Sequence, residues 1–305
     1  MKLTPIALFT YKRPQHTLQT LESLQNNELG KLSSLYIFSD AAKSSQDQVQ
    51  VNQVKQIIRQ KQWCNEVHII ERESNYGLAK NIIEGITQMV NQFGKVIVLE
   101  DDIVTSSGFL TYMNQALDLY QNTPEVMHIS AYLPPIDTHE VQQDTFFFNQ
   151  TSCWGWGTWK SAWEKFIPDP VTLYQQVKIA NHISRFNMDN SYDFMSHLKA
   201  NLEGSLHTWA IKWYASVFLE KGLCLHPKIS LTRNIGFDNT GEHCVYSKEY
   251  LEQKITDEIL VTPISIAENK IIRQKIATYN RNQSKPPTFR ELLKNKIRNY
   301  LKWKR

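Results

Sequence analysis

The sequence is poor in the residues that build disulfide-linked or zinc-stabilised folds. Its 305 residues include only four cysteines, widely scattered and with no C-x-x-C pair: Cys64, Cys153, Cys224 and Cys244. Structural zinc and a disulfide framework are therefore not indicated. The chain also lacks eighteen consecutive apolar residues, so we expect no membrane-spanning helix. The apolar run at the amino terminus is too short for a signal peptide. We expect a cytoplasmic protein.

Glycine-rich phosphate loops are missing as well. The sequence contains no G-x-x-x-x-G-K-[ST] motif, which a P-loop ATPase requires. The stretch "WGWGTW" offers Gly155 and Gly157 but no third glycine, and it does not follow the first predicted strand. A dinucleotide-binding fingerprint is therefore absent too. Any phosphate that binds here must be held by another device.

The body of the chain lacks an excess of basic residues. The formal net charge is +4, but the last twenty residues contain seven basic residues and one acidic residue. The other 285 residues therefore carry a net charge of −2. Nothing in the body forms a basic stripe, so we expect no nucleic-acid partner.

Strand and helix patterns alternate along the first hundred residues. The segments "PIALFT", "SLYIFSD", "EVHIIE" and "KVIVL" have strand composition, and a segment with helical periodicity separates each from the next. The third helical segment, "GLAKNIIEGITQMVNQF", places its apolar residues on one face of the helix. This alternation predicts an α/β fold with a parallel sheet and crossover helices.

Polar residues follow each of the four predicted strands. Ligands in such sheets bind beyond the carboxyl ends of the strands, so these residues are expected to share one rim. The last strand runs directly into three carboxylates, Glu100, Asp101 and Asp102. The other polar residues of the rim are Thr10, Tyr11, Arg13, Asp40, Asn75, Lys80 and Asn81.

Three adjacent carboxylates at the end of a buried strand repel one another unless a positive charge neutralises them. Asp102 could cap the helix predicted in "SSGFLTYMNQAL", although Ser106 or Ser107 could do so equally well. Alternatively, the carboxylates hold a divalent cation, and their oxygen atoms suit Mg²⁺ or Mn²⁺. A cation that bridges carboxylate and diphosphate would replace the missing glycine-rich loop.

The order of several segments resembles the GT-A glycosyltransferases. The acidic triplet resembles their metal motif, as found in the N-acetylglucosaminyltransferase I type and in bacterial family 2-like sugar transferases. The resemblance covers roughly residues 4 to 245. It includes "PIALFTYKRP", "IFSD", "NYGLAKNIIEGI", "SCWGWGTWKSAW" and "TWAIKWYASVFLEKGLCLHPKISLTRNIGFDNTGEHC".

The resemblance implies a Rossmann-like nucleotide-binding half (residues 1–115) joined to a mixed-sheet acceptor half (116–250), followed by a basic helical tail (251–305). It implies an inverting, metal-dependent glycosyltransferase that uses a nucleotide-diphosphate sugar, UDP above all, with Mn²⁺ or Mg²⁺. The acceptor would be a glycan or lipid-linked glycan in bacterial surface polysaccharide synthesis.

The resemblance also assigns roles to individual residues. Asp102 matches the direct metal ligand, and Glu100 and Asp101 line the ribose and sugar. Asp40 matches the contact to the uracil ring, and Arg13 lies beside the nucleotide. His243, in "NTGEHC", is expected to reach the metal or the diphosphate.

Acceptor binding is expected from tryptophans. Trp154, Trp156 and Trp159 flank two glycines, which suits a loop that presents flat faces to a pyranose ring, although they could equally form core. Trp209 matches the acceptor-side helix.

The catalytic base is less well indicated, because the residue after this Trp is Ala210 where the family carries an Asp. We expect His207, kept neutral at a helix amino terminus, to replace it, with Glu203 as the alternative.

The tail and two rival functions complete the predictions. In the tail, Phe289, Leu293, Ile297, Tyr300 and Leu301 share one helical face. That face predicts either a helix on the anionic inner surface of the membrane or one that packs on the body.

The rival functions are a sugar nucleotidyltransferase and a non-catalytic sugar-binding protein. The first counts as weaker, because "ALFTYKRPQ" lacks its glycine-rich loop.

Overall fold

A computed structural model describes residues 3–240 and 246–283. Eight of the described strands form one sheet with the order β3-β2-β1-β4-β8-β6-β9-β7. The first four in this order pair in parallel, and β8 joins the sheet antiparallel to both β4 and β6. The strands are β1 (Ile6–Thr10), β2 (Ser34–Ser39), β3 (Glu66–Glu71), β4 (Lys95–Glu100), β6 (Val126–Ser130), β7 (Thr145–Phe148), β8 (Trp156–Trp159) and β9 (Leu223–Pro227).

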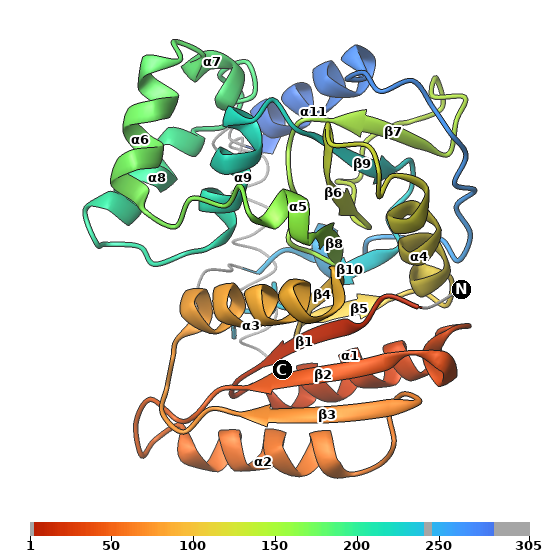
Figure 1. The fold of residues 1–305 in the computed structure, drawn as a ribbon, viewed down its shortest axis with the longest axis vertical. Coiled ribbons are helices and arrows are strands. Elements are labelled where there is room, and N and C mark those ends of the chain that lie inside the picture. The colour runs from red at the N-terminus through yellow and green to blue at the C-terminus, as the bar shows by residue number, and fades with distance from the viewer. Residues whose placement is uncertain (1–2, 241–245, 284–305) are drawn as a thin grey trace, which may run out of the picture.

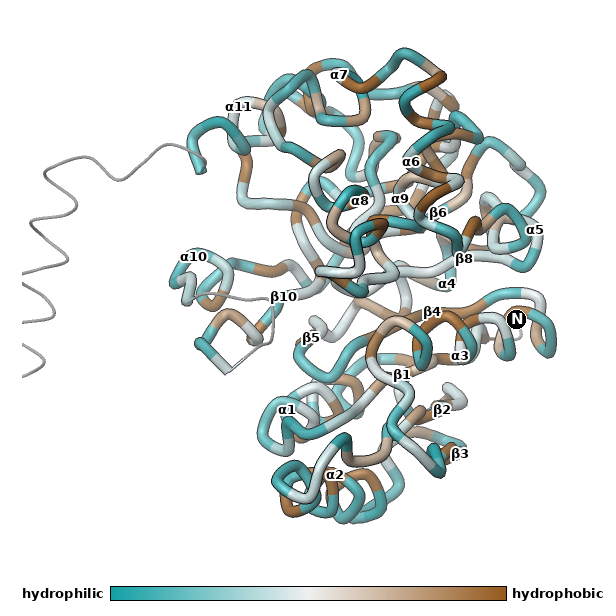
Figure 2. The backbone as a smooth tube through the Cα atoms, turned by 90° about the vertical axis from the view of Figure 1, so that its left-hand side faces the viewer, coloured by the Kyte–Doolittle hydropathy of each residue, from teal (hydrophilic) through white to brown (hydrophobic). Residues whose placement is uncertain are grey.

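The parallel part of the sheet has the predicted architecture. Crossover helices connect its strands, and they are α1 (Pro14–Gln25), α2 (Gln48–Arg59) and α3 (Leu78–Phe93). Figure 2 shows α1 and α2 on one side of β1–β3. Alternate residues of β1 serve opposite cores. Ile6 and Leu8 pack in the cluster that includes Leu21 and Val54 of α1 and α2, whereas Ala7 and Phe9 pack with residues of α3. The predicted mixed α/β fold is therefore confirmed.

Helices cover the antiparallel half of the sheet. In Figure 1, α6 to α9 gather at one side of this half, away from β1–β3. Their apolar residues form a separate core around Phe186, Leu198 and Tyr214. The helices of this half are α4 (Phe109–Leu119), α5 (Lys160–Trp163), α6 (Pro170–Ile179), α7 (Ile183–Phe186), α8 (Phe194–Leu202) and α9 (Ala210–Leu219).

The chain returns to the parallel half near its end. The short strands β5 (Ile103–Thr105) and β10 (Thr232–Asn234) pair antiparallel, and Ile235 donates its backbone N–H to the carbonyl of Asp102 at 2.9 Å. This pairing brings the residues after β10 next to the acidic triplet.

Two further helices follow β10, with α10 (Lys248–Leu251) at the predicted boundary of the tail and α11 (Lys270–Gln283) within the segment expected to form it. Ile272 and Ile276 of α11 pack on Phe146 and Phe148 of β7. No helix among the described residues is long and apolar enough to cross a membrane. The predicted amphipathic face, Phe289 to Leu301, lies outside the described residues, and the predicted domain boundaries stay predictions.

Candidate nucleotide-sugar site

The carboxyl ends of the parallel strands bring together several of the predicted polar residues. The backbone N–H of Tyr11 donates to Oδ2 of Asp101 at 3.2 Å, which links the end of β1 to the end of β4. The backbone N–H of Asp40 donates to the carbonyl of Thr10 at 3.0 Å, which links β2 to β1. The rim predicted from the strand ends is therefore present in the fold.

Asp102 forms an ion pair with Arg13, with 2.7 Å between Oδ2 and Nη1. Their side chains are 15% and 17% exposed, so the pair borders solvent without being freely hydrated. Asp102 does not cap the following helix. The N-cap of α4 is Gly108, and no side chain caps this helix. The helix-cap interpretation of Asp102 is therefore excluded by the structure.

With all three carboxyl groups ionised, the triplet would carry more negative charge than one guanidinium can neutralise. Burial raises the pKa of Glu100 well above its usual range, and the neighbouring Asp102 and Asp101 raise it further. Burial also raises the pKa of Asp101, again with a contribution from Asp102. Arg13 opposes both shifts. Such a site favours an additional cation, and its carboxylate oxygens are the ligands that Mg²⁺ and Mn²⁺ prefer.

Asp238 and His16 extend this site, and sequence reasoning missed both. Asp238 Oδ1 lies 3.7 Å from Arg13 Nη2, and Asp238 Oδ2 lies 3.1 Å from His16 Nε2. Thr240 accepts a further hydrogen bond from Arg13 Nη2 at 3.1 Å. Only the β5–β10 pairing brings these residues together, so no local motif could have predicted them.

A metal at Asp102 would need ligands from outside the protein. The part of the chain that the structure describes contains no group of three or more His, Cys, Asp or Glu side chains placed to hold a metal. Mg²⁺ typically binds one or two carboxylates and completes its shell with substrate phosphates and water. Asp102, at the partly exposed end of the triplet, suits that kind of site. His243, the other predicted metal ligand, lies outside the described residues.

Asp40 is built into the rim differently from the prediction. Its two carboxylate oxygens accept hydrogen bonds from the backbone N–H groups of Ala41, Tyr76 and Gly77 and from Asn75 Nδ2, at 2.9 to 3.2 Å. Each oxygen accepts from two donors, which fills its ordinary capacity. Asp40 therefore fixes the loop before α3, and in this conformation it has no free oxygen for a nucleobase.

Several buried polar atoms along the rim have no hydrogen-bond partner among the described residues. Thr10 Oγ1 and Ser39 Oγ belong to paired positions on β1 and β2, and Arg13 Nε and Arg72 Nη2 lie just after β1 and β3. Buried polar atoms are normally paired. Four orphaned atoms at the ends of neighbouring strands therefore indicate a polar ligand at this rim.

The remaining predicted donor residues have structural partners. Asn81 is 3% exposed, and its Oδ1 accepts a hydrogen bond from Arg72 Nε at 2.9 Å. Lys80 is exposed, with Nζ 4.1 Å from the ring centre of Tyr76. Arg72 lies over the same ring at 4.7 Å. These residues stiffen the loop that Asp40 holds.

Trp154 and Trp209 line a cavity of about 400 Å³ in the antiparallel half. Trp209 also lies against Glu100, where it opposes the rise in the pKa of that carboxyl group, and it stacks on Trp156, with ring centres 5.2 Å apart. The cavity wall therefore touches the acidic triplet. Trp156 and Trp159 are core residues, 0% and 6% exposed. The expectation that these two present open faces to a sugar is not met, because their neighbours enclose them.

The predicted catalytic bases lie outside this cavity lining. Glu203 is the C-cap of α8, and Gly204 with φ of +73° ends that helix. The next helix, α9, begins only at Ala210, so His207 lies in the exposed connection rather than at the helix start. His197 of α8 lines the cavity instead, with Nε2 3.2 Å from the hydroxyl of Tyr192. Burial lowers the pKa of His197.

No protein-family model matches this chain. A search of curated proteins likewise found no match. Among solved structures, the chain is similar to TarS residues 1–349 of S. aureus, with 15% identity over 53% of this chain and 48% of that 1–349 chain, and a TM-score of 0.39. The match thus spans about half the length of the solved 1–349 chain.

Two solved sugar transferases are covered more fully. The mannosyltransferase PcManGT of Pyrobaculum calidifontis, solved with GDP-Man and Mn²⁺, has 12% identity over 72% of this chain and 74% of its own, with a TM-score of 0.41. The galactosyltransferase LgtC, solved with donor and acceptor sugar analogues, has 7% identity over 70% of both chains, with a TM-score of 0.37. At these identities and scores, the functional proposal has to come from the geometry of the site.

Proposed function

We propose that this protein is a metal-dependent glycosyltransferase that uses a nucleotide-diphosphate sugar. The observation that carries this proposal is the contact of Trp209 with Glu100. Trp209 joins a rim of orphaned polar atoms and excess carboxylates to a cavity lined by aromatic residues. A transferase that moves a sugar needs a donor site and an acceptor site in contact, and Trp209 and Glu100 supply that junction.

The residues of the rim have separate tasks in this proposal. Thr10, Ser39 and Arg72 offer unpaired polar atoms to the nucleoside. Asp40 fixes the loop beside it. Asp102 holds Mn²⁺ or Mg²⁺, and the bound ion would neutralise charge that develops on the leaving diphosphate. Arg13, already paired with Asp102, adds a fixed positive charge at the same place.

The finer expectations remain predictions. They are a UDP donor, inversion at the anomeric carbon, a glycan or lipid-linked glycan acceptor, bacterial surface polysaccharide synthesis and attachment to the inner face of the membrane. His207 and Glu203 stay candidate bases, although each would need to approach the cavity from its exposed position. Trp154 and Trp209 are the acceptor-side tryptophans we retain.

Release of nucleotide from a panel of UDP- and GDP-sugars, with and without Mn²⁺, tests the proposal. We expect metal-dependent release by the wild type and a loss of at least about 100-fold in Asp102→Asn, because a metal ligand supports several kcal/mol of charge stabilisation. Asp144→Asn, which alters an ion pair with Lys228 before β7, is the matched control. A protein that binds the sugars without releasing nucleotide would instead be the non-catalytic alternative.

A further inference from the structure

The cavity beside Trp209 has an unusual charge composition. None of its described lining residues is Asp, Glu, Lys or Arg. The lining also contains His197 and His226, and burial lowers the pKa of both imidazoles, which keeps them uncharged. A charged ligand in this cavity therefore meets no side chain of opposite charge in the described lining.

The walls nevertheless carry hydrogen-bonding groups among the aromatic faces. Tyr132, Tyr250 and Tyr279 line the cavity together with Trp154, and the hydroxyls of Tyr279 and Tyr250 lie 3.4 Å apart. The side chain of Asn280 lines it as well. Aromatic faces mixed with hydroxyl and amide groups suit a pyranose, which has apolar C–H faces and an equatorial ring of hydroxyls. An alkyl chain would desolvate these polar groups without pairing them.

Carboxylates lie behind the cavity lining at two places, with Glu100 beside Trp209 and Glu249 close to Tyr250 and Tyr279. The charge of Glu249 contributes to the raised pKa of Tyr279, and Glu249 Oε2 accepts a hydrogen bond from Gln283 Nε2 at 2.7 Å. A phosphorylated or carboxylated sugar would bring a second negative charge close to Glu249. Burying such a charge without a partner is costly.

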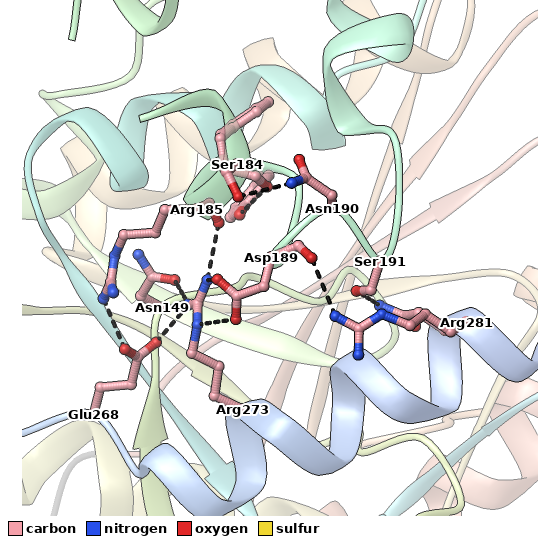
Figure 3. Close-up of polar contacts among 12 residues, drawn as sticks. Asn149, Ser184, Arg185, Asp189, Asn190, Ser191, Glu268, Arg273 and Arg281 are labelled. Carbon is pink, nitrogen blue, oxygen red and sulfur yellow. Dashed lines mark hydrogen bonds and ion pairs between the residues drawn. The ribbon is translucent and has the colours of Figure 1, made fainter. Parts of the chain in front are cut away.

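The helix α11 forms one wall of the cavity through Ile276, Tyr279 and Asn280. Figure 3 shows how Arg273 fastens this helix. Its guanidinium forms two hydrogen bonds with Asp189, at 2.9 and 3.0 Å, and one with Glu268 at 3.0 Å. The charge of Arg273 is thus matched locally, and it is not offered to a ligand in the cavity.

We propose that the cavity binds an uncharged pyranose unit of the acceptor, and that Tyr279 of α11 contacts this sugar. This inference rests on the proposed glycosyltransferase function, since it names the class of its acceptor. Arg273 is a positioning residue, because it acts through the placement of α11. Tyr279 is the specificity-determining residue, because it lines the cavity and its hydroxyl lies 3.4 Å from that of Tyr250.

Saturation-transfer NMR and calorimetry on the full chain test this inference with defined probes. The panel comprises methyl glycosides of glucose, galactose and N-acetylglucosamine, the methyl glycoside of glucuronic acid, glucose 6-phosphate, and octanol. We expect at least one neutral glycoside to bind, and the anionic sugars to bind about tenfold more weakly or not at all. Tyr279→Ala is expected to weaken neutral binding about tenfold, which corresponds to the loss of one aromatic contact.

Gln274→Ala, on an exposed turn of α11 outside the cavity lining, is the matched control and should bind as the wild type does. Preferential binding of the anionic sugars or of octanol, binding unaffected by Tyr279→Ala, or no binding of any glycoside would overturn the inference. The charge preference needs only wild-type protein, so it stands even if Tyr279→Ala does not fold. Nucleotide release is measured on the same samples. Its absence alongside neutral-glycoside binding would refute the glycosyltransferase proposal rather than the sugar preference of the cavity.

Discussion

Replacement of Arg273 by Met is the sharpest test of how α11 is held. Arg273 is 6% exposed and donates to Asp189, Glu268, Asn149 and the carbonyl of Arg185. Its partner Asp189 is one of three consecutive residues with positive φ, Met188 to Asn190, between +52° and +56°. Such backbone is unfavourable for side-chain-bearing residues, so the ion pair helps to hold a strained loop.

The magnitude follows from the exposure of the two carboxylates. Breaking a fully buried ion pair costs about 3–5 kcal/mol, because an unpaired charge stays buried. Here the side chain of Asp189 is 48% exposed, and Glu268 keeps its ion pair with Arg185 at 2.7 Å. Water and Arg185 therefore recover part of the loss. We expect Arg273→Met to lower the free energy of unfolding by about 2–3 kcal/mol.

Urea denaturation measures this change, and hydrogen exchange of α11 shows where it acts. Arg281→Met is the matched control on the same helix. Arg281 makes one exposed hydrogen bond, from Nη2 to the carbonyl of Asp189 at 3.2 Å, so its loss should cost less than about 0.5 kcal/mol. The reasoning about this ion pair would be refuted if the free energy of unfolding of Arg273→Met lay within about 0.5 kcal/mol of the wild-type value. It would also be refuted if the backbone amides of α11 exchanged no faster in the variant.

Three further predictions address pH, the acidic site and the backbone. The hydrogen bond from Arg273 lowers the pKa of Asp189 in the folded protein. The stabilisation by this ion pair is therefore present above the unfolded-state pKa of 3.8 and is lost as the pH falls through the lower folded-state pKa. Urea titrations at several pH values should accordingly show that the difference in unfolding free energy between the wild type and Arg273→Met shrinks below about pH 4. Gly236→Ala should reduce nucleotide release with little effect on thermal unfolding, since its new Cβ would lie 2.2 Å from Oδ2 of Asp102, and full activity would argue against this placement. Lys221→Gly should stabilise the protein by about 1 kcal/mol in urea denaturation, because this exposed residue has φ of +56° after α9, and a loss of stability would contradict the assigned backbone.

The parallel half could be predicted from the sequence because its signals are local. Strand composition and helical periodicity alternate through residues 5 to 100, and the carboxyl ends of parallel strands meet at one edge by geometry alone. The rim from Thr10 to Asp102 followed from these two facts. The role of Asp40 was harder to predict, because an aspartate after a strand has the same sequence signature whether it binds a ligand or fixes a loop.

The remaining parts of the site depend on contacts between distant segments. Asp238 meets Arg13 and His16 only because β10 pairs with β5, and no local pattern encodes that pairing. The prediction of open tryptophan faces failed for a different reason. Tryptophans next to glycines occur in both exposed and buried strands, and Trp156 is buried because it packs against Trp209 and Trp213.

The separation of α8 from α9 explains why the predicted bases were placed poorly. The sequence pattern allowed one helix to run from Glu203 towards Trp209. The structure instead ends α8 at Leu202 and starts α9 at Ala210, which leaves His207 exposed. The α11 wall of the cavity was not predicted either, because the contacts of Arg273 with Arg185 and Asp189 join residues more than 80 positions apart.

Calorimetric titration of UDP into the protein, with and without Mn²⁺, tests the central claim most directly. If the rim holds a nucleotide diphosphate through a metal on Asp102, UDP should bind in the presence of Mn²⁺ and at least about tenfold more weakly without it. Asp102→Asn should remove the metal dependence, and Asp144→Asn should keep it. Equal UDP affinity with and without Mn²⁺, or an unchanged metal dependence in Asp102→Asn, would contradict the account.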